Sequence, residues 1–182
     1  MRNTPLCGVP GPVLGFSLAE VLVVLALLAV LLGLAVPAVN SLRARHELQA
    51  LAEEVWQSLM LARSQALAQQ TRVVLCPAAS DGVCDPQGQW AQGWLVFVDR
   101  QQNGRRDAEE PVLQSRGALP VGVRLAGNST VNLGVRYGAD GLGQGLGGTL
   151  TVCKPGLSEQ WKVVINMLGR PRLEKADAMD CR

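Results

Sequence analysis

Gly15-Phe16-Ser17-Leu18-Ala19-Glu20 opens the stretch that decides the fold of this 182-residue chain, and a long apolar run follows it directly. Residues 21–39 contain no charged side chain, and only Gly33 and Pro37 interrupt a composition of leucine, valine and alanine. A run of this length is close to the roughly 20 residues that cross the core of a bilayer as a helix. The sequence therefore predicts a membrane-spanning helix near the amino terminus.

The apolar run has three simpler explanations: a cleaved signal peptide, a plain signal anchor or a buried core helix. A core helix normally carries polar residues on one side, and a signal peptide has a shorter apolar region that ends at a small-x-small cleavage site. Glu20 favours another explanation, because a carboxylate at the edge of a membrane segment is costly and needs a positive partner. A cut after Gly15 would create one, the new amine of Phe16 on a neighbouring copy.

The spacing of this stretch resembles that of type IV prepilins and pseudopilins. Gly15 precedes Phe16, Glu20 is the fifth residue after the cut, and Pro37 is the twenty-second. The resemblance implies that residues 1–15 are a leader, which prepilin peptidase removes after Gly15, and that Phe16 is then N-methylated. It also implies that the helices pack into a filament, where Glu20 neutralises the terminal amine of an adjacent subunit and Pro37 kinks or locally melts the helix.

Beyond this run, the chain changes to an amphipathic helix and then to strands. Apolar residues recur at three- and four-residue steps up to about Gln70, at Leu48, Leu51, Val55, Leu59, Ala62 and Ala66. Strand-like runs then alternate with turns rich in Gly, Asp and Asn, at 72–76, 94–98, 121–125, 130–137, 148–153 and 161–167. The expected fold class is α+β, with a long amino-terminal helix packed on a small antiparallel β domain.

We therefore expect a leader at 1–15, a transmembrane and filament-core helix at 16–39, an amphipathic helix at 40–70, and one globular β domain at 71–182. Residues 93–99 and 148–153 resemble the corresponding parts of the GspH/FimT branch of pseudopilins. That resemblance covers nearly the whole mature chain and implies a helix packed against two small antiparallel sheets.

Four cysteines follow the leader, an even number that favours disulfides in a domain beyond the membrane. Three pairings are possible, and we favour Cys76–Cys84 and Cys153–Cys181. We expect no zinc site, because no CxxC spacing occurs. The segment 99–110 resembles the spacing of a calcium loop, but arginines within it favour a hairpin turn with Asn103-Gly104 at its tip. No metal and no cofactor are expected.

The segment Gly169-Arg170-Pro171-Arg172 is the strongest candidate binding site. Residues two apart in an extended backbone point to the same side, and Pro171 favours that conformation, so the two guanidiniums form a pair suited to phosphate oxygens. Such a motif resembles the mark of FimT-type minor pilins that bind DNA, which implies contacts from Gly169, Arg170 and Arg172. If the Cys153–Cys181 bond folds the tail over this pair, further cations extend the patch: Lys154, Lys162, Lys175 and Arg182.

The net charge of +2 does not by itself indicate a nucleic-acid protein, and no catalytic motif is present, so we expect no enzyme. The leading hypothesis is a FimT-like minor pilin that binds extracellular DNA without sequence preference during natural transformation. The alternative is a structural GspH-like minor pseudopilin of a type II secretion system. Expected partners are other major and minor pilins, prepilin peptidase, the inner-membrane assembly platform and DNA. The expected location is the bacterial inner membrane, crossed once with the globular domain in the periplasm, and then the extracellular pilus.

Overall fold

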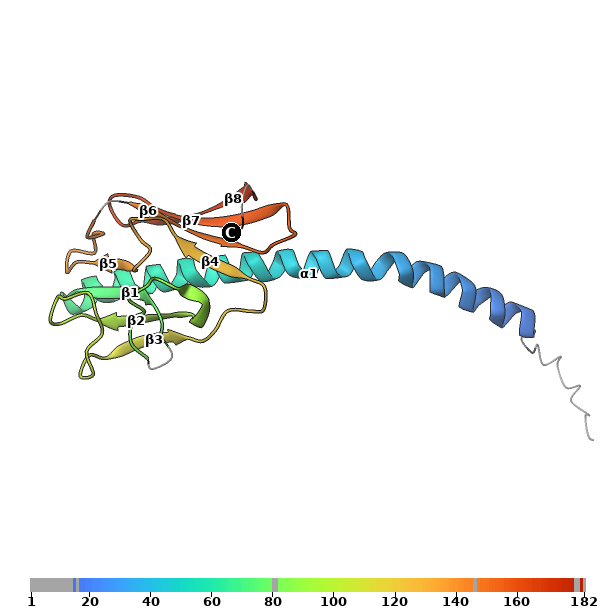
Figure 1. Ribbon diagram of the computed structural model, residues 1–182, viewed down its shortest axis with the longest axis horizontal. Coiled ribbons are helices and arrows are strands. Elements are labelled where there is room, and N and C mark those ends of the chain that lie inside the picture. The colour runs from blue at the N-terminus through green and yellow to red at the C-terminus, as the bar shows by residue number, and fades with distance from the viewer. Residues whose placement is uncertain (1–14, 16, 80–81, 146, 179–180, 182) are drawn as a thin grey trace, which may run out of the picture. The chain divides into compact units, whose positions relative to one another are not determined.

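The computed structural model describes residue 15 and the segments 17–79, 82–145 and 147–178, together with residue 181 (Figure 1). Of residues 34–38 only the backbone is described. The leader residues 1–14, the amino group of Phe16, the side chain of Pro37 and Arg182 therefore lie outside the described residues. The chain divides into two units, Met1–Asn40 and Ser41–Arg182.

One helix, α1 (Leu18–Gln69), connects the two units, and local sequence sets both of its ends. At the start, the Ser17 hydroxyl oxygen accepts a hydrogen bond from the backbone N–H of Glu20 at 3.2 Å, so Ser17 is the N-cap and Glu20 is the third helical residue. At the end, Gln70 adopts a left-handed φ of 49°. The Thr71 N–H then donates to the Ala66 carbonyl at 3.3 Å, which completes a Schellman motif.

Within the first unit, the large apolar side chains of the helix between Leu18 and Leu32 are exposed. Across the described part of the chain, the structure contains no helix with both the length and the apolar character required to span a membrane.

The second unit contains two four-stranded antiparallel sheets (Figure 1). The first has the order β3-β2-β1-β5, with β1 at Val73–Pro77, β2 at Trp94–Val98, β3 at Val112–Arg116 and β5 at Val135–Tyr137. The second has the order β4-β6-β7-β8, with β4 at Arg124–Gly127, β6 at Gly148–Cys153, β7 at Glu159–Ile165 and β8 at Pro171–Asp177. A short 3-10 helix, Trp90–Gln92, precedes β2. The predicted α+β class with two antiparallel sheets is confirmed.

The strand positions agree with the sequence pattern where strands are buried and depart from it at the edges. The runs that form β1 and β2 are buried at every residue, which explains why they read as continuous apolar segments. The segment 130–137 is a strand only from Val135, and the strand expected at 121–125 begins at Arg124. Two edge strands, β3 and β8, were not predicted, because their largely polar sequences lack a buried face.

The core lies between the second half of α1 and the two sheets. The predicted apolar stripe of the helix is confirmed, since each of its members is no more than 3 % exposed: Leu48, Leu51, Val55, Leu59, Ala62 and Ala66. These side chains form one cluster with inward residues of both sheets, including Trp94 of β2, Tyr137 of β5 and Val163 of β7. Because the described core residues begin at Leu48, the segment Ser41–Arg182 carries the whole cluster and is expected to fold by itself.

Two disulfides close the unit, and both are the pairs favoured from the sequence. Cys76 and Cys84 are joined across a short loop, with Cα atoms 5.6 Å apart, and this loop covers a second apolar cluster on the outer face of β1 and β2. Cys153 and Cys181 join the end of β6 to the carboxy-terminal tail, with Cα atoms 5.8 Å apart. The predicted pairing is confirmed, and the second bond fixes the tail beside the second sheet.

Two buried hydrogen bonds connect parts of the core that lie far apart in the sequence. The indole N–H of Trp94 donates to the Ser58 hydroxyl of α1 at 2.9 Å, and that hydroxyl donates in turn to the Glu54 carbonyl at 2.9 Å. The phenol of Tyr137, on the first sheet, donates to the Gly169 carbonyl at 2.9 Å, in the turn between β7 and β8 of the second sheet. The first bond holds the helix to one sheet, and the second holds the two sheets together.

Ser58→Ala should lower the free energy of unfolding of Ser41–Arg182 by about 1–3 kcal/mol, because the buried indole N–H of Trp94 loses its acceptor. Ser64→Ala is the matched control: Ser64 is exposed and its hydroxyl donates only to the Leu61 carbonyl, so the change should stay within about 0.5 kcal/mol. Urea unfolding followed by tryptophan fluorescence measures both. Equal losses in the two variants would contradict a role for the buried bond.

Burial raises the pKa of Tyr137 well above its usual 10.0, with the nearby Arg63 charge opposing the shift. The folded state therefore keeps the phenol protonated while the unfolded chain ionises it, so this contribution to stability is present below about pH 10 and is lost above it. Tyr137→Phe should lower the free energy of unfolding by about 1–3 kcal/mol at neutral pH, because the Gly169 carbonyl loses its donor. The difference from the parent should shrink as the pH rises from about 9 to 11. Urea unfolding across that range measures it, and a constant difference would refute the assignment.

Candidate nucleic-acid interface

The hairpin turn between β7 and β8 positions the predicted arginine pair. The Gly169 N–H donates to the Asn166 carbonyl at 2.9 Å, and the Asn166 N–H donates to the Arg170 carbonyl at 3.2 Å. The side-chain oxygen of Asn166 accepts the backbone N–H groups of Leu168 and Arg170, at 3.0 and 2.9 Å. Asn166 therefore fixes the backbone on both sides of the turn, as asparagine commonly does.

Gly169 is required in this turn for two reasons. Its φ of 75° lies in the left-handed region, which other residues rarely adopt. A Cβ atom there would also lie 2.5 Å from the Gly143 nitrogen and 2.8 Å from a ring carbon of Tyr137. The resemblance to FimT-type pilins implied that Gly169 contacts DNA. In the fold the groups close to Gly169 are Gly143 and Tyr137, and Gly169 is buried, so it positions the arginines.

Arg170 and Arg172 are both exposed at the start of the edge strand β8. The indole N–H of Trp56 in α1 donates to the Pro171 carbonyl between them at 3.1 Å, which attaches this end of the strand to the helix. Within the described residues the Arg170 side chain has no hydrogen-bond or ion-pair partner. The Arg172 guanidinium lies 2.6 Å from the Glu174 carboxylate, and the two side chains are 62% and 43% exposed. The pair is therefore accessible, with Arg172 partly compensated.

Strand register determines which other predicted cation shares this face. Arg172 lies opposite Val164, and Glu174 lies opposite Lys162. Directly opposed residues of an antiparallel pair point to the same side, so Lys162 belongs to the face that Arg172 occupies. Lys162 makes no ion pair with the described carboxylates.

Two predicted cations lie on the other side, towards the helix. The Lys154 ammonium is 3.0 Å from Glu47 of α1. The Lys175 ammonium is 2.6 Å from Glu159, which also contacts Arg45 at 3.7 Å. The hydrogen bond from Lys175 lowers the pKa of Glu159, against an opposing effect of burial, so the carboxylate is charged at neutral pH and compensates both cations. The structure thus brings Arg170, Arg172 and Lys162 together and directs Lys154 and Lys175 elsewhere.

Sequence reasoning missed one cation near the disulfide. Arg124 of β4 lies opposite Cys153, and its guanidinium donates to the Cys181 carbonyl at 3.0 Å. The contact fixes the tail of the chain beside β4. The sequence placed Arg124 in a strand at 121–125 but did not predict this contact, because only the pairing of β4 with β6 brings Arg124 to the disulfide.

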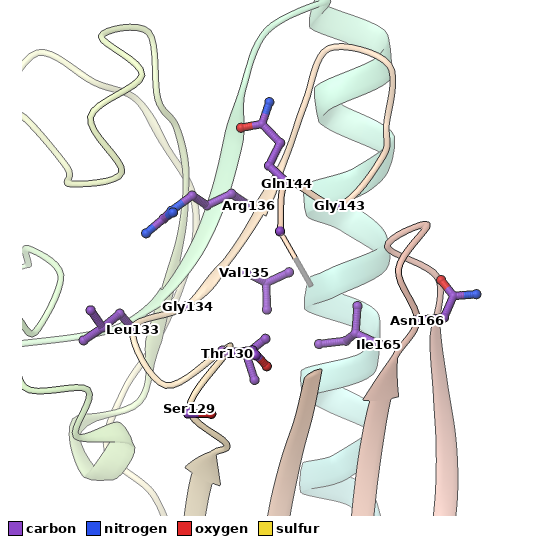
Figure 2. A pocket seen from close by; sticks show the side chains of 12 residues that line it. Ser129, Thr130, Leu133, Gly134, Val135, Arg136, Gly143, Gln144, Ile165 and Asn166 are labelled. Atoms are coloured by element: carbon purple, nitrogen blue, oxygen red, sulfur yellow. The ribbon is translucent and has the colours of Figure 1, made fainter. Parts of the chain in front are cut away.

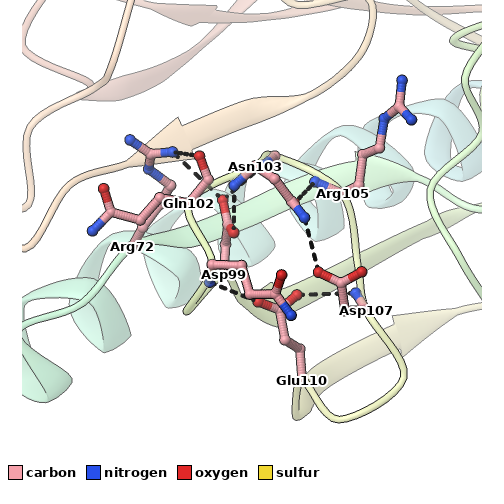
Figure 3. Close-up of polar contacts among 9 residues, drawn as sticks. Arg72, Asp99, Gln102, Asn103, Arg105, Asp107 and Glu110 are labelled. Atoms are coloured by element: carbon pink, nitrogen blue, oxygen red, sulfur yellow. Dashed lines mark hydrogen bonds and ion pairs between the residues drawn. The ribbon is translucent and has the colours of Figure 1, made fainter.

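The loop that resembles a calcium site is held by hydrogen bonds from its own backbone (Figure 3). The two oxygens of Asp99 accept the N–H groups of Asn103 and Gly104, at 3.1 and 3.0 Å. The two oxygens of Glu110 accept those of Gln101 and Asp107, at 3.2 and 3.0 Å. Among the described residues no group of three potential metal ligands forms. The Asp99 and Glu110 carboxylates therefore hold the backbone of the loop that connects β2 and β3.

Comparison with solved structures identifies relatives of this fold. The type IV minor pilin FimU of Pseudomonas aeruginosa aligns with a TM-score of 0.58 and 20% identity, over 76% of this chain and 98% of its own. The minor pseudopilin EpsH from the type 2 secretion system of Vibrio cholerae aligns with a TM-score of 0.51 and 14% identity, over 74% of this chain and 99% of its own. These likenesses concern the fold alone.

Sequence comparison identifies the family. No curated protein sequence matches the chain. The family model described as type II transport protein GspH matches residues 51–169, which is more than half of the chain and includes most of the core and all strands but β8. With the long helix and two antiparallel sheets, this match shows that the chain belongs to the GspH/FimT branch of the type IV pilin-like family.

Proposed function

We propose that this chain is a minor subunit of a type IV pilus that binds DNA through Arg170 and Arg172. As a member of its family it is a pilin or pseudopilin, and such subunits assemble with other pilins. The proposal of DNA binding rests on one observation, an exposed arginine pair on a constrained edge strand. Asn166, Gly169 and Trp56 fix the backbone on which the two guanidiniums stand.

The candidate phosphate-binding residues differ in whether a neighbouring carboxylate already compensates their positive charge. The Arg170 side chain has no partner among the described residues, Arg172 shares its charge with Glu174, and Lys162 lies on the same face. These three are the proposed phosphate contacts. Lys154 and Lys175 contribute less, because each already faces a carboxylate. Arginine forks bind phosphate oxygens without reading bases, so binding is independent of sequence and weakened by salt.

The proposed assembly route begins at the amino terminus. Prepilin peptidase cleaves after Gly15, Phe16 is methylated, and residues 16–39 hold the subunit in the inner membrane before the assembly platform inserts it into a filament. The exposed apolar side chains between Leu18 and Leu32 support packing against neighbouring helices in that filament. Natural transformation is the proposed purpose of DNA capture by an extracellular pilus.

A second candidate is a structural minor pseudopilin of a type II secretion system. The matching family model carries the description type II transport protein GspH, and the fold is also similar to that of EpsH. In that case the arginine pair has no DNA-binding role, so the two candidates differ in one measurable property.

Arg170→Gln combined with Arg172→Gln should weaken DNA binding by Ser41–Arg182 about tenfold or more at low salt, and lower the slope of log affinity against log salt by about 2, because two phosphate contacts are lost. Fluorescence anisotropy with a labelled duplex measures both quantities. Lys154→Gln combined with Lys175→Gln removes the same charge and should have a much smaller effect.

Equal losses in the two double variants would indicate a response to net charge and contradict the arginine site. An unmutated domain that fails to bind DNA even at low salt would favour the secretion candidate.

Glu20→Gln should leave membrane insertion intact and strongly reduce the amount of subunit in sheared filaments, because the charge that pairs with the neighbouring amine is lost. The substitution keeps the backbone N–H that donates to Ser17, so the start of α1 is preserved. Ser17→Ala is the converse control, which removes the N-cap but keeps the carboxylate and should assemble normally. Immunoblots of membrane and sheared fractions measure both, and filaments with a normal content of Glu20→Gln would argue against the pairing.

A further inference from the structure

A second group of arginines surrounds a cavity of about 530 Å³ beside the first sheet. Its walls come from residues 83–86 next to the Cys76–Cys84 disulfide, from residues 103–107, and from Leu133 and Arg136. Arg105 and Arg106 belong to the loop between β2 and β3, whereas Arg136 belongs to β5. Three guanidinium groups from two distant segments therefore meet around one cavity.

These arginines are little compensated by neighbouring groups. In the segments that the structure describes, none of the three forms an ion pair, and the side chains of Arg105 and Arg136 also lack hydrogen bonds. Figure 3 shows Arg105 extending away from the loop. Arg106 donates one bond to the Gly82 carbonyl at 3.1 Å, while its Nε is buried without a partner in the described structure. The guanidiniums of Arg105 and Arg136 thus remain free to bind a ligand, while that of Arg106 is held by the Gly82 carbonyl.

The acidic side chains of the cavity wall accept hydrogen bonds from groups within their own loops. The two oxygens of Asp85 accept the backbone N–H groups of Gln87 and Gln89, at 3.0 and 2.8 Å. One oxygen of Asp107 accepts the side-chain amide of Asn103 at 2.8 Å. These bonds tie the Asp85 carboxylate to the backbone of its own turn and the Asp107 carboxylate to the Asn103 side chain. Like charges held close together disfavour one another, and a bound anion relieves that repulsion. Guanidinium forks match the oxygens of a phosphate in particular.

Gly104 allows Arg136 to reach the cavity. A Cβ atom on Gly104 would lie 3.1 Å from the Arg136 Nε and 3.5 Å from its Cζ, so the guanidinium lies directly over the bare backbone of the loop tip. Figure 2 shows the Arg136 side chain extending from β5 away from Ile165 and Asn166. Its guanidinium therefore faces the loop that carries Arg105.

A smaller cavity of about 220 Å³ is lined both by Arg136 and by Asn166 of the turn before β8 (Figure 2). Leu133 and Arg136 line both cavities, so the two are adjacent. The far wall of the smaller one includes Asn166, the residue whose side chain accepts the Arg170 N–H. Polar groups of Thr130 and Gln144 also line it. Leu133 and Arg136 thus lie between the cavity that Arg105 lines and the cavity that Asn166 lines.

We propose that the cavity of Arg105, Arg106 and Arg136 binds phosphate groups of a nucleic-acid backbone, as a second contact for the strand held at Arg170 and Arg172. This inference rests on the proposed DNA-binding function. The proposed DNA path is then longer and crosses both sheets. The two arginine sites are expected to contribute together to affinity and to salt dependence. The ligand is recognised by its phosphodiesters, so base sequence has no effect.

The test uses the full chain in non-ionic detergent, a long labelled duplex and fluorescence anisotropy at several salt concentrations. Arg105→Gln combined with Arg136→Gln removes the two guanidiniums without side-chain partners and spares Arg106, which holds Gly82. The expected result is a loss of about tenfold in affinity and a fall of about 2 in the salt slope. Arg43→Gln combined with Arg100→Gln is the charge-matched control, because both are exposed and outside the cavity, and it should bind nearly as tightly as the parent.

The outcomes separate this inference from the proposed function. Loss in the Arg105/Arg136 variant and in the Arg170/Arg172 variant, with a normal control, supports one DNA path. Parent-like binding of the Arg105/Arg136 variant with loss in the other overturns the second contact and leaves the β8 site standing. Loss only in the Arg105/Arg136 variant supports the cavity but overturns the β8 site. Binding of a heparin fragment at this cavity without any DNA binding would overturn a nucleic-acid ligand.

Discussion

The structure depends on the burial of one stripe of α1, from Leu48 to Ala66, between two sheets. The sheets contribute inward residues to the same cluster as the helix, and the second apolar cluster, on the outer face of β1 and β2, is much smaller. Burial of aliphatic and aromatic surface is the dominant favourable term in folding, so the helix is the element on which both sheets rely. The Ser58–Trp94 hydrogen bond restricts how the helix lies on the sheet, because the buried indole N–H must keep its acceptor.

The same packing determines the geometry of the surface. Gly169 lies against Gly143 and Tyr137, so the turn that precedes Arg170 is fixed by the contact between the sheets. Trp56 of the helix binds the carbonyl of Pro171, between the two arginines. The exposed cations of β8 are thus supported from within by the core. Rigid support of this kind reduces the entropy lost when a side chain binds a ligand, which favours recognition by few contacts.

The two faces of the second sheet show how burial and charge separate structural cations from accessible ones. Lys154 and Lys175 face the helix and each meets a glutamate. Arg170 and Lys162 lie on the surface without a carboxylate partner in the described residues. Exposed ion pairs add little stability, but each one lowers the local positive potential that a phosphate would feel. The pairing of cations, more than their number, therefore decides where an anion binds.

The sequence by itself determined the features that depend on local pattern. The helical stripe, the buried strands β1 and β2, and the α+β class follow from spacing and composition, and the two cysteine pairs were chosen correctly among three possibilities. Only the tertiary structure decided the features that depend on strand pairing. It added the polar edge strands β3 and β8, paired Lys154 with Glu47, and brought Arg136 over Gly104. These residues are far apart in the chain, and their meeting is set by register and packing between elements, which no local pattern records.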